Sequence, residues 1–369
     1  MKMRSEQRYQ QQMRSTLLVL LAAAISLWGL LAIHRTLALT GDWEHFLLRQ
    51  TIWAGVAWTL FFAVSKIKFD SLMRCAYPGA IVGALSLVLL PLLGSRINGM
   101  CGWYTFCGLT IQPSEIFKVF YLLAIIKLLY DKKIPEAMRV FSCVGIIAVF
   151  ALLLFIQPDF GTMTVYLAGG LGTLYFSKVK FKYIAIMLGL AALTALLAIA
   201  MNGYMAARIR HFINPELDPG GGAWHLRQFA IAAARGEWFG VKADMAVWSN
   251  SFLPLAHNDS IFAALCEILG FCGGMIILLL YAGFFHQAFS LSAWQRNNMR
   301  RSVIDSLTAM ILFQTLLHIA VNLNLLPPTG ITLPLVSYGG SSLTGTMLMI
   351  AVIISAGNRK SSPLPALES

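Results

Sequence analysis

The sequence contains few charged residues. Only 12% of its 369 residues are Asp, Glu, Lys or Arg, whereas 58% are apolar. Soluble domains carry roughly a quarter charged residues and about half apolar ones. The shortage of charge therefore excludes a water-soluble domain of ordinary composition, and it indicates a protein that crosses a membrane several times.

The chain also lacks the usual signatures of a metal or redox site. Its six cysteines form no C-x-x-C pair and show no Cys/His metal spacing. Four of them lie in or beside apolar segments, where a small polarizable side chain packs well. Cys101 and Cys107 share one short loop and could form a disulfide if that loop faces an oxidising compartment. Low-complexity tracts, short repeats and a soluble domain of any size are absent as well.

Long apolar runs fill most of the chain. The first run follows a basic tail, is longer than a signal-peptide core and lacks a small-x-small cleavage site, so we interpret it as a retained span. The pattern predicts an all-α polytopic membrane protein with about ten transmembrane helices. Their approximate ranges are 16–33, 50–65, 76–94, 113–130, 140–156, 161–176, 183–201, 261–286, 303–323 and 334–357.

Basic residues are distributed unequally between the two sides of this arrangement. Ten spans put both termini on one side, where short segments hold 19 of the 28 Lys and Arg residues, against three in the short loops opposite. The positive-inside rule therefore predicts cytoplasmic termini, and it explains the net charge of +12 without a nucleic acid as partner. This topology divides the chain into a cytoplasmic tail (1–15), helices one to seven (16–201), an extracytoplasmic loop (202–260), helices eight to ten (261–357) and a second cytoplasmic tail (358–369).

The predicted outer loop over 202–260 holds about 59 residues, and a loop of that length is usually functional or disordered. Its many aromatic residues argue against a solvated tether. Helical spacing over Ala223–Ala234 predicts a short helix at the membrane interface, so we expect a structured loop. Arg208 and Arg210 lie just past the seventh span. They could hold a pyrophosphate bidentately, or they could contact anionic lipid headgroups without forming a site.

Two acidic motifs lie at the predicted outer ends of spans. Glu115 and Lys118 open the fourth span and are three residues apart, so they share one helix face and can pair. The pair could be purely structural, since each charge makes burial of the other tolerable, or it could line a pocket for a polar headgroup. Asp159 stands at a helix N-cap position with Thr162 three residues on, and capping is its favoured role, with a contribution to an outward-facing site as the alternative.

The segment before the eighth span carries the carboxylate that we consider the strongest candidate for catalysis. Placing a charged side chain at a membrane span costs a free energy on the order of 3 kcal/mol unless the charge has a partner or a function. Asp259 follows His257 and Asn258 directly before the apolar run, and Glu267 lies eight residues further on, roughly 12 Å along a helix axis and about 80° round it. We therefore expect Asp259 to act alone as a base, with Glu267 supporting the pocket. His257 could bind a ligand or be a satisfied interface residue.

The entrance to the last predicted span is rich in helix-breaking residues. Pro334, Gly339 and Gly340 would break or kink a helix, which a membrane tolerates only where the freed backbone is buried in protein or lines a cavity. Close packing of small residues between helices is the alternative. The polar residues of this segment favour a cavity wall; they are Ser337, Tyr338, Ser341 and Ser342.

Taken together, these motifs resemble the SEDS family (shape, elongation, division and sporulation), to which RodA and FtsW belong. The resemblance covers most of the chain, and the short termini are similar to the RodA branch. It is carried by Arg49-Gln50, Gln112-Pro-Ser-Glu115 with Lys118, Gln157-Pro-Asp-Phe-Gly-Thr162, His257-x-Asp259 and the segment from Leu326-Pro to Ser342.

Several positions depart from the family pattern. Leu255 stands where the family usually has Glu, Ser260 replaces an aromatic residue, and Trp103 lacks a preceding Arg. A Gly-rich stretch of the family is replaced by Ile231–Trp238. The resemblance therefore implies a divergent member, altered on the predicted active face.

The resemblance implies a peptidoglycan glycosyltransferase that uses lipid II at the outer face of the bacterial cytoplasmic membrane, together with a class B penicillin-binding protein. The family's catalytic aspartate falls on Asp259, and Glu115 and Lys118 match residues important for activity. In such a reaction an acceptor hydroxyl attacks the anomeric carbon of the donor, which needs one base and positive charge near the leaving pyrophosphate. Arg208, Arg210 and Lys118 are candidates for that charge.

A divalent cation, Mg²⁺ or Mn²⁺, could share the neutralisation of the pyrophosphate, and we expect no organic cofactor. Two other functions use the same features: a transporter that flips a lipid-linked sugar, and a scaffold without catalysis that recruits a synthase. The polymerase interpretation predicts one outward groove that joins Asp259, Glu115, Lys118 and the segment 337–342. Catalytic groups must converge on one substrate, so Asp259 and Glu115 should lie within about 20 Å of each other.

Overall fold

The computed structural model describes residues 2–37, 43–97, 100–106, 109–189, 192, 203–218, 223–241, 245–253 and 255–358. Three sequence predictions fall wholly or partly outside these residues. They concern most of the second half of the predicted seventh span, the pairing of Cys101 with Cys107, and the tail beyond Asn358.

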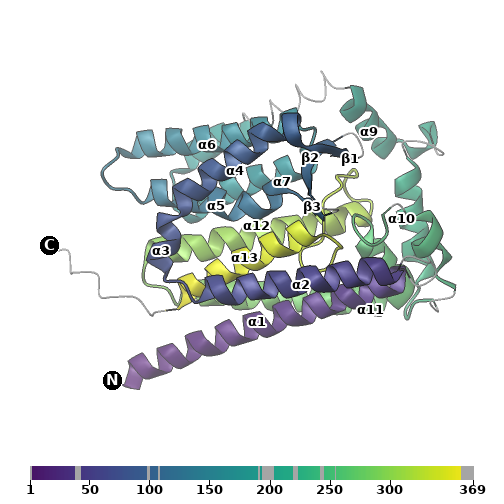
Figure 1. Cartoon of the computed structure of the whole chain (residues 1–369), viewed down its shortest axis with the longest axis horizontal. Coiled ribbons are helices and arrows are strands. Elements are labelled where there is room, and N and C mark those ends of the chain that lie inside the picture. Colours follow the sequence, from purple (N-terminus) through teal and green to yellow (C-terminus); the bar gives the residue numbers. More distant parts are fainter. Residues whose placement is uncertain are drawn as a thin grey trace.

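Long helices dominate the fold and run roughly parallel to one another (Figure 1). Within the described residues, seven helices are long and apolar enough to cross a membrane. They are α1 (Lys2–Thr36), α2 (Trp43–Ser65), α4 (Ala76–Leu93), α6 (Glu136–Ile156), α11 (Ile261–Ala293), α12 (Asn298–Asn322) and α13 (Gly340–Gly357). Two further helices of 17 residues each, α5 (Pro113–Leu129) and α7 (Phe160–Phe176), lie among them. The predicted polytopic helical fold is confirmed.

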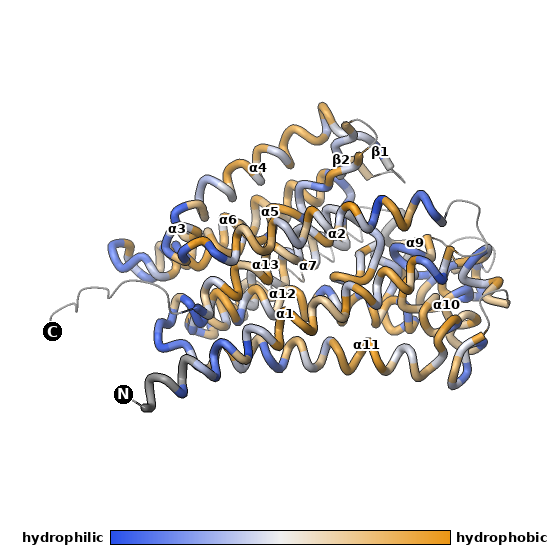
Figure 2. Tube along the Cα trace, turned by 60° about the horizontal axis from the view of Figure 1, so that its bottom comes forward, coloured by the Kyte–Doolittle hydropathy of each residue, from blue (hydrophilic) through white to orange (hydrophobic). Residues whose placement is uncertain are grey.

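The hydropathy of the residues changes along the helix axes, from the middle of the bundle to its ends. Figure 2 shows apolar residues along the middle of the bundle and hydrophilic ones towards its two ends. One end holds the start of α1 and the short helix α3 (Phe69–Arg74). The opposite end, which we call the loop end, holds the short strands and the helices of the long loop.

The centre of the bundle is formed by α12 and α13. In these helices 72% and 89% of the most apolar stretch is buried, against 17% in α2. Around them, α7 packs on α12, α2 packs on α13, and α5 contacts both. The approach of α13 to α5 requires a glycine, because a Cβ on Gly345 would lie 2.0 Å from the carbonyl oxygen of Glu115. The first turn of α5 is therefore fixed against α13.

Several boundaries differ from the sequence prediction. The helix α1 extends back to Lys2, and α11 continues to Ala293. The last helix begins at Gly340 and not at Pro334, because the chain over 334–339 forms turns, as expected for its prolines and glycines. Hydropathy cannot place such ends, since α1 continues through the polar residues of the basic tail and α11 continues through Gln287 and two serines.

A small antiparallel sheet was not predicted. Its strands are β1 (Ser95–Ile97), β2 (Met100–Phe106) and β3 (Leu109–Ile111), in that order. The segment contains Thr, Trp, Tyr and Ile, which favour strands, but its strands are only three to seven residues long, so it was interpreted as a loop between two spans. The sheet lies directly before α5 in the chain and brings β2 and β3 to the loop end.

The described parts of the long loop are structured, as expected. They comprise α9 (Gly203–Ile213), a 3₁₀ turn at Pro215–Leu217 (η1), α10 (Trp224–Arg235) and one π-helical turn at Trp248–Phe252 (η3). The predicted helix over 223–234 is confirmed by α10. Next to α10, the carbonyls of Glu237 and Trp238 accept hydrogen bonds from the backbone of Phe271 and Cys272, where α11 is interrupted at Gly270. The loop therefore satisfies the backbone groups that this break exposes.

Candidate active site

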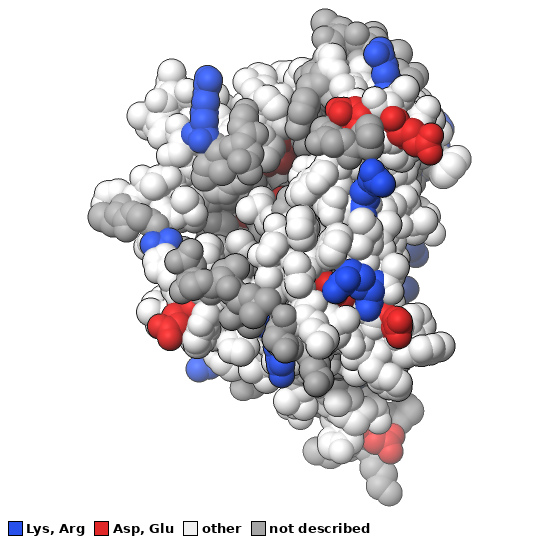
Figure 3. All heavy atoms as spheres, turned by 90° about the vertical axis from the view of Figure 1, so that its right-hand side faces the viewer, with Lys and Arg blue, Asp and Glu red and all other residues white. Residues whose placement is uncertain are grey.

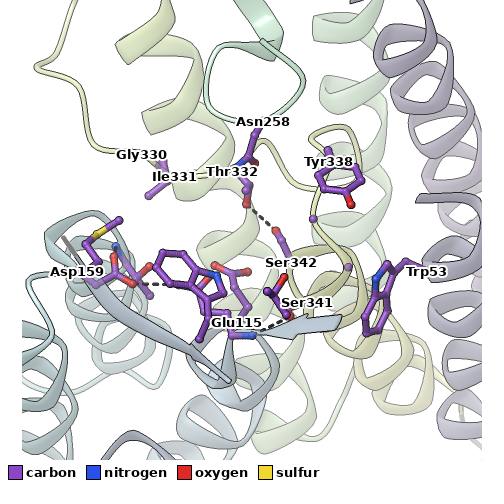
Figure 4. Close-up of a pocket in the computed structure, with 17 residues that line it drawn as sticks. Trp53, Glu115, Asp159, Asn258, Gly330, Ile331, Thr332, Tyr338, Ser341 and Ser342 are labelled. Carbon is purple, nitrogen blue, oxygen red and sulfur yellow. Dashed lines mark hydrogen bonds between the residues drawn. The ribbon is translucent and has the colours of Figure 1, made fainter. Parts of the chain in front are cut away.

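A cavity of about 110 Å³ lies at the loop end of the bundle. Its walls come from β2, β3, the beginnings of α5, α7 and α13, and the loops around Asn258 and Gly330 (Figure 4). Seen from this end, the surface is hollowed, and acidic side chains lie in the recess (Figure 3). The residues that line the cavity are Trp53, Met100, Trp103, Thr110, Gln112, Glu115, Asp159, Thr162, Asn258, Gly330, Ile331, Thr332, Tyr338, Gly339, Gly340, Ser341 and Ser342.

The pair of Glu115 and Lys118 forms part of this site. The Lys118 ammonium lies 2.7 Å from Oε2 of Glu115 and donates a second hydrogen bond of 2.9 Å to Oε1 of Gln314. Lys118 is completely buried, whereas Glu115 lines the cavity. The predicted ion pair is therefore present, and Lys118 neutralises a carboxylate that itself faces the cavity.

Asp159 combines the two roles considered for it. Its carboxylate caps α7 by accepting a hydrogen bond of 3.1 Å from the backbone of Thr162, and the Gln112 side chain donates a second one of 3.1 Å. It also lines the cavity, on the side away from α13 in Figure 4. Burial raises the pKa of Asp159, and the negative charge of Glu115 acts in the same direction, whereas the hydrogen bonds from Thr162 and Gln112 oppose the shift.

The first turn of α13 and the two residues before it form a second wall of the cavity. The Ser341 hydroxyl accepts a hydrogen bond of 2.9 Å from the Gln112 backbone, which fixes α13 to the start of α5. The Ser342 hydroxyl lies 2.6 Å from that of Thr332, which in turn accepts a hydrogen bond from Gln314. A continuous polar network therefore connects α13, the loop at 332 and the buried Lys118.

Ser337 lies behind this wall and not in it. Its hydroxyl accepts a hydrogen bond from the Leu333 backbone and donates one of 2.8 Å to the carbonyl of Asn258. The next residue, Tyr338, donates its backbone N–H to the carbonyl of His257 at 2.8 Å. The contribution of Ser337 is therefore to hold the loop that contains Asp259.

His257 supports the same loop through its ring. The ring centroid lies 4.7 Å from that of Phe46 and 5.4 Å from that of Tyr338. Burial lowers the pKa of His257, so the neutral form is favoured. Of its two predicted roles, the geometry matches the satisfied interface residue.

Asp259 lies at the edge of the cavity. A Cβ built on Gly330, which lines the cavity, would lie 3.6 Å from Oδ2 of Asp259, and Gly330 has a positive φ of 72°. The neighbouring Asn258 is part of the lining. The structure thus brings the Asp259 loop to the cavity that Glu115 and residues 338–342 line, whereas Lys118 and Ser337, which the predicted groove included, do not line it.

Two residues of α12 that sequence reasoning missed fix the loops at the edge of the cavity. The Asn322 side chain donates to the carbonyl of Asp259 at 3.0 Å and accepts from the Ala263 backbone at 3.1 Å. Its neighbour one turn earlier, His318, lies 2.8 Å from the carbonyl of Ile331 through Nδ1. With Gln314 these residues recur every four positions inside an apolar run, which is the signal that could have identified them.

Glu267 and Arg210 do not line the cavity. The Glu267 carboxylate binds the Arg235 side chain at 3.1 Å and the backbone N–H groups of Trp248 and Ser249. The predicted pocket support is therefore wrong in its location: Asp259 lies in the turn before α11, whereas Glu267 lies in α11 on the face that packs against α10 and η3. Arg210 is exposed on α9, and the side chain of Arg208 lies outside the described residues.

No group of three or more His, Cys, Asp or Glu residues in the described ranges could hold a metal ion. The carboxylates of Glu115 and Asp159 already have partners within the protein. A divalent cation at this cavity would therefore take most of its ligands from a substrate and from water, as Mg²⁺ often does beside a pyrophosphate.

Comparison with known proteins gives consistent matches over nearly the whole chain. The family model described as "Cell cycle protein", which covers FtsW, RodA and SpoVE, matches residues 12–362. A probable peptidoglycan glycosyltransferase FtsW from Alkalilimnicola ehrlichii is 30% identical over 92% of this chain and 86% of its own length. The corresponding protein from Halorhodospira halophila is 32% identical over 92% of this chain and 89% of its own length.

Solved structures show the same fold. A chain from a peptidoglycan synthase complex that coordinates polymerization and crosslinking matches with a TM-score of 0.77 and 27% identity, over 92% of this chain and 96% of that chain. The rod shape determining protein RodA from Thermus thermophilus matches with a TM-score of 0.70 and 25% identity, over 92% and 95% of the two chains.

Proposed function

The chain belongs to the FtsW, RodA and SpoVE family, and we propose that it joins lipid II disaccharide units into the glycan strands of the bacterial cell wall. It is a multi-pass membrane protein and a glycosyltransferase, in keeping with relatives that carry the name peptidoglycan glycosyltransferase. The observation that carries the proposal is the position of the Asp259 loop at the edge of a polar cavity that Glu115 and Asp159 share.

In the proposed reaction the acceptor sugar hydroxyl attacks the anomeric carbon of the donor sugar. The C–O bond to the polyprenyl pyrophosphate breaks as the new glycosidic bond forms on the opposite face, so the configuration at the anomeric carbon is inverted. Asp259 accepts the proton of the attacking hydroxyl and acts as the base. The pyrophosphate leaves with the bonding electron pair.

The start of α13 is suited to hold the oxygens of the substrate. The first N–H groups of a helix have no intrahelical acceptor and favour anions, and the first turn of α13 lines the cavity with the hydroxyls of Ser341 and Ser342. Lys118 is completely buried, so in this arrangement it acts through Glu115. Arg208 and Arg210 on α9 are the proposed cationic contacts for the pyrophosphate outside the cavity.

If a divalent cation takes part, it would neutralise charge on the pyrophosphate, with the substrate and water supplying most ligands. The residues of this cavity do not form a dedicated cation site, and the steps above need only the protein's own groups.

We further propose that both termini are cytoplasmic and that the loop end faces outward. The excess of Lys and Arg in segments on the terminal side supports this orientation, and the start of α1 lies opposite the loop end (Figure 1). A class B penicillin-binding protein is the proposed partner. It would crosslink the strands that this chain polymerises, and the fold match to a chain of a complex coupling these two activities supports it.

Polymerisation by the purified full-length chain tests the function directly. Labelled lipid II should be converted into glycan chains, and addition of the cognate class B penicillin-binding protein should raise the yield. If the chain moves lipid II between bilayer leaflets but produces no glycan with or without its partner, it is a transporter and the proposal fails.

A further inference from the structure

A second and larger cavity lies away from the active site, among the ends of α5, α7, α11 and α12. Its volume is about 520 Å³, within the range of cavities that bind small molecules. None of the residues lining it belongs to the site described above. They are Tyr130, Tyr175, Phe176, Ser177, Lys178, Phe289, Ser292, Asn298, Arg301, Ser302 and Asp305.

The walls of this second cavity are held in place by hydrogen bonds between three helices. The Tyr130 hydroxyl, at the end of α5, lies 2.7 Å from that of Ser302 on α12 and donates to the carbonyl of Asn298 at 3.1 Å. The Ser302 hydroxyl donates to the carbonyl of Phe176, the last residue of α7, at 3.2 Å. Hydrogen bonds between three helices therefore fix the shape of this cavity.

Its charged residues are arranged for a single negative charge. Arg301 and Lys178 contribute two positive charges, and Asp305 contributes one negative charge. Nε of Arg301 lies 3.7 Å from Oδ2 of Asp305, an ion pair that is too long for a hydrogen bond, so the guanidinium keeps donors for a ligand. The Ser177 hydroxyl in the wall is buried and has no hydrogen-bond partner among the described residues.

The backbone of Lys178 has a conformation that normally favours glycine. This residue lies two positions after the last residue of α7 and has a φ of 58°, in the left-handed region. The backbone N–H of Lys178 bonds to the carbonyl of Tyr175, and that of Val179 bonds to Leu174, as in a helix end built around glycine. A lysine there accepts strain that a glycine would avoid, and Lys178 is one of the residues that line the cavity.

The surroundings favour a lipid over a soluble anion. Tyr175, Phe176 and Phe289 form an aromatic part of the wall, and Tyr175 is 64% exposed. Aromatic and basic residues at the ends of spanning helices lie at the depth of lipid headgroups. We propose that this cavity binds the phosphate group of an anionic membrane lipid between Arg301 and Lys178, with its glycerol part against the aromatic wall.

Lipid binding by the purified full-length chain tests the proposal without reference to catalysis. The delipidated protein is titrated with phosphatidylglycerol, phosphatidylcholine or inorganic phosphate, and retention is followed by native mass spectrometry and thermal unfolding. Phosphatidylglycerol should bind about tenfold tighter than phosphatidylcholine, and Arg301→Gln or Lys178→Gly should each remove about that factor, since each loses a charge-assisted hydrogen bond. Inorganic phosphate alone should give no thermal shift.

Two variants separate lipid binding from folding. Lys178→Gly relieves the strained φ, so without lipid it should unfold at the same or a higher temperature than the wild type although its lipid affinity falls. Lys132→Gln, which removes a positive charge at an exposed turn after α5, should change neither quantity. Wild-type affinity for phosphatidylglycerol in both Arg301→Gln and Lys178→Gly would overturn the proposal, and so would a shift with inorganic phosphate but none with the lipid.

Discussion

The hydrogen bonds of Asn322 offer a direct way to disturb the Asp259 loop without touching the cavity. This amide is almost completely buried on α12, donates to the carbonyl of Asp259 and accepts from the backbone of Ala263, the third residue of α11. It therefore fixes both the residue proposed as base and the helix that follows it. Asn322→Ala removes both bonds and leaves every residue that lines the cavity unchanged.

The expected effect has a structural and a catalytic part. Leaving a buried N–H and a buried carbonyl without a partner costs about 1–3 kcal/mol for each group that water cannot reach. The free energy of unfolding should fall by an amount of this order. The loop is also released from α12, and a displacement of about 1 Å at a reacting group can lower the rate by roughly 100-fold.

Lipid II polymerisation and thermal unfolding should be measured together, with Gln295→Ala as the control. Gln295 is also a buried amide, and its side chain donates to the carbonyls of Leu291 and Gly357, away from the cavity. Both variants should lose stability, but only Asn322→Ala should lose most of its rate at a temperature where both are folded. Equal rates in the two variants would refute the positioning role of Asn322.

Three further predictions concern packing, charge and pH. Gly345→Ala should lower the unfolding free energy by about 1–3 kcal/mol, because its Cβ would meet the Glu115 carbonyl at 2.0 Å; unchanged thermal unfolding would contradict this packing. Glu115→Gln leaves Lys118 charged and buried and should cost about 3–5 kcal/mol, most of which a second change, Lys118→Met, should restore; failure of the second change to restore stability would contradict the pairing. Because burial lowers the pKa of His257 below its ordinary 6.5, the unfolded chain binds more protons, and stability should fall as the pH drops below about 6.5; His257→Gln should flatten this dependence in unfolding measured against pH.

Much of the fold could be predicted because the membrane imposes one length and one composition on its helices. The ends of the helices were harder to predict from the sequence. The start of α13 at Gly340 depends on how Pro334 and the glycines turn in three dimensions, and periodicity does not record that. The strands of β1–β3 were missed because they are only three to seven residues long.

The residues of the candidate site could be predicted where an ionisable or polar residue stands at the end of an apolar span. Glu115, Asp159 and the serines at 341 and 342 lie around one cavity, because ionisable or polar groups at the end of a span need a common polar environment. Glu267 is also an ionisable residue in an apolar span, yet its carboxylate binds residues of the long loop. The sequence does not show which face of α11 points to the cavity, because that depends on how the helices pack. Asn322 was overlooked because a single amide in an apolar helix is also compatible with simple helix packing.

The most direct test of the central claim is lipid II polymerisation by the Asp259→Asn variant. The change is nearly isosteric and keeps the backbone carbonyl that Asn322 binds, so folding and lipid II binding should match the wild type. Loss of a general base should reduce the rate about 10²–10⁴-fold. Glycan chains formed by Asp259→Asn at the wild-type rate would contradict the assignment of Asp259 as the base of this reaction.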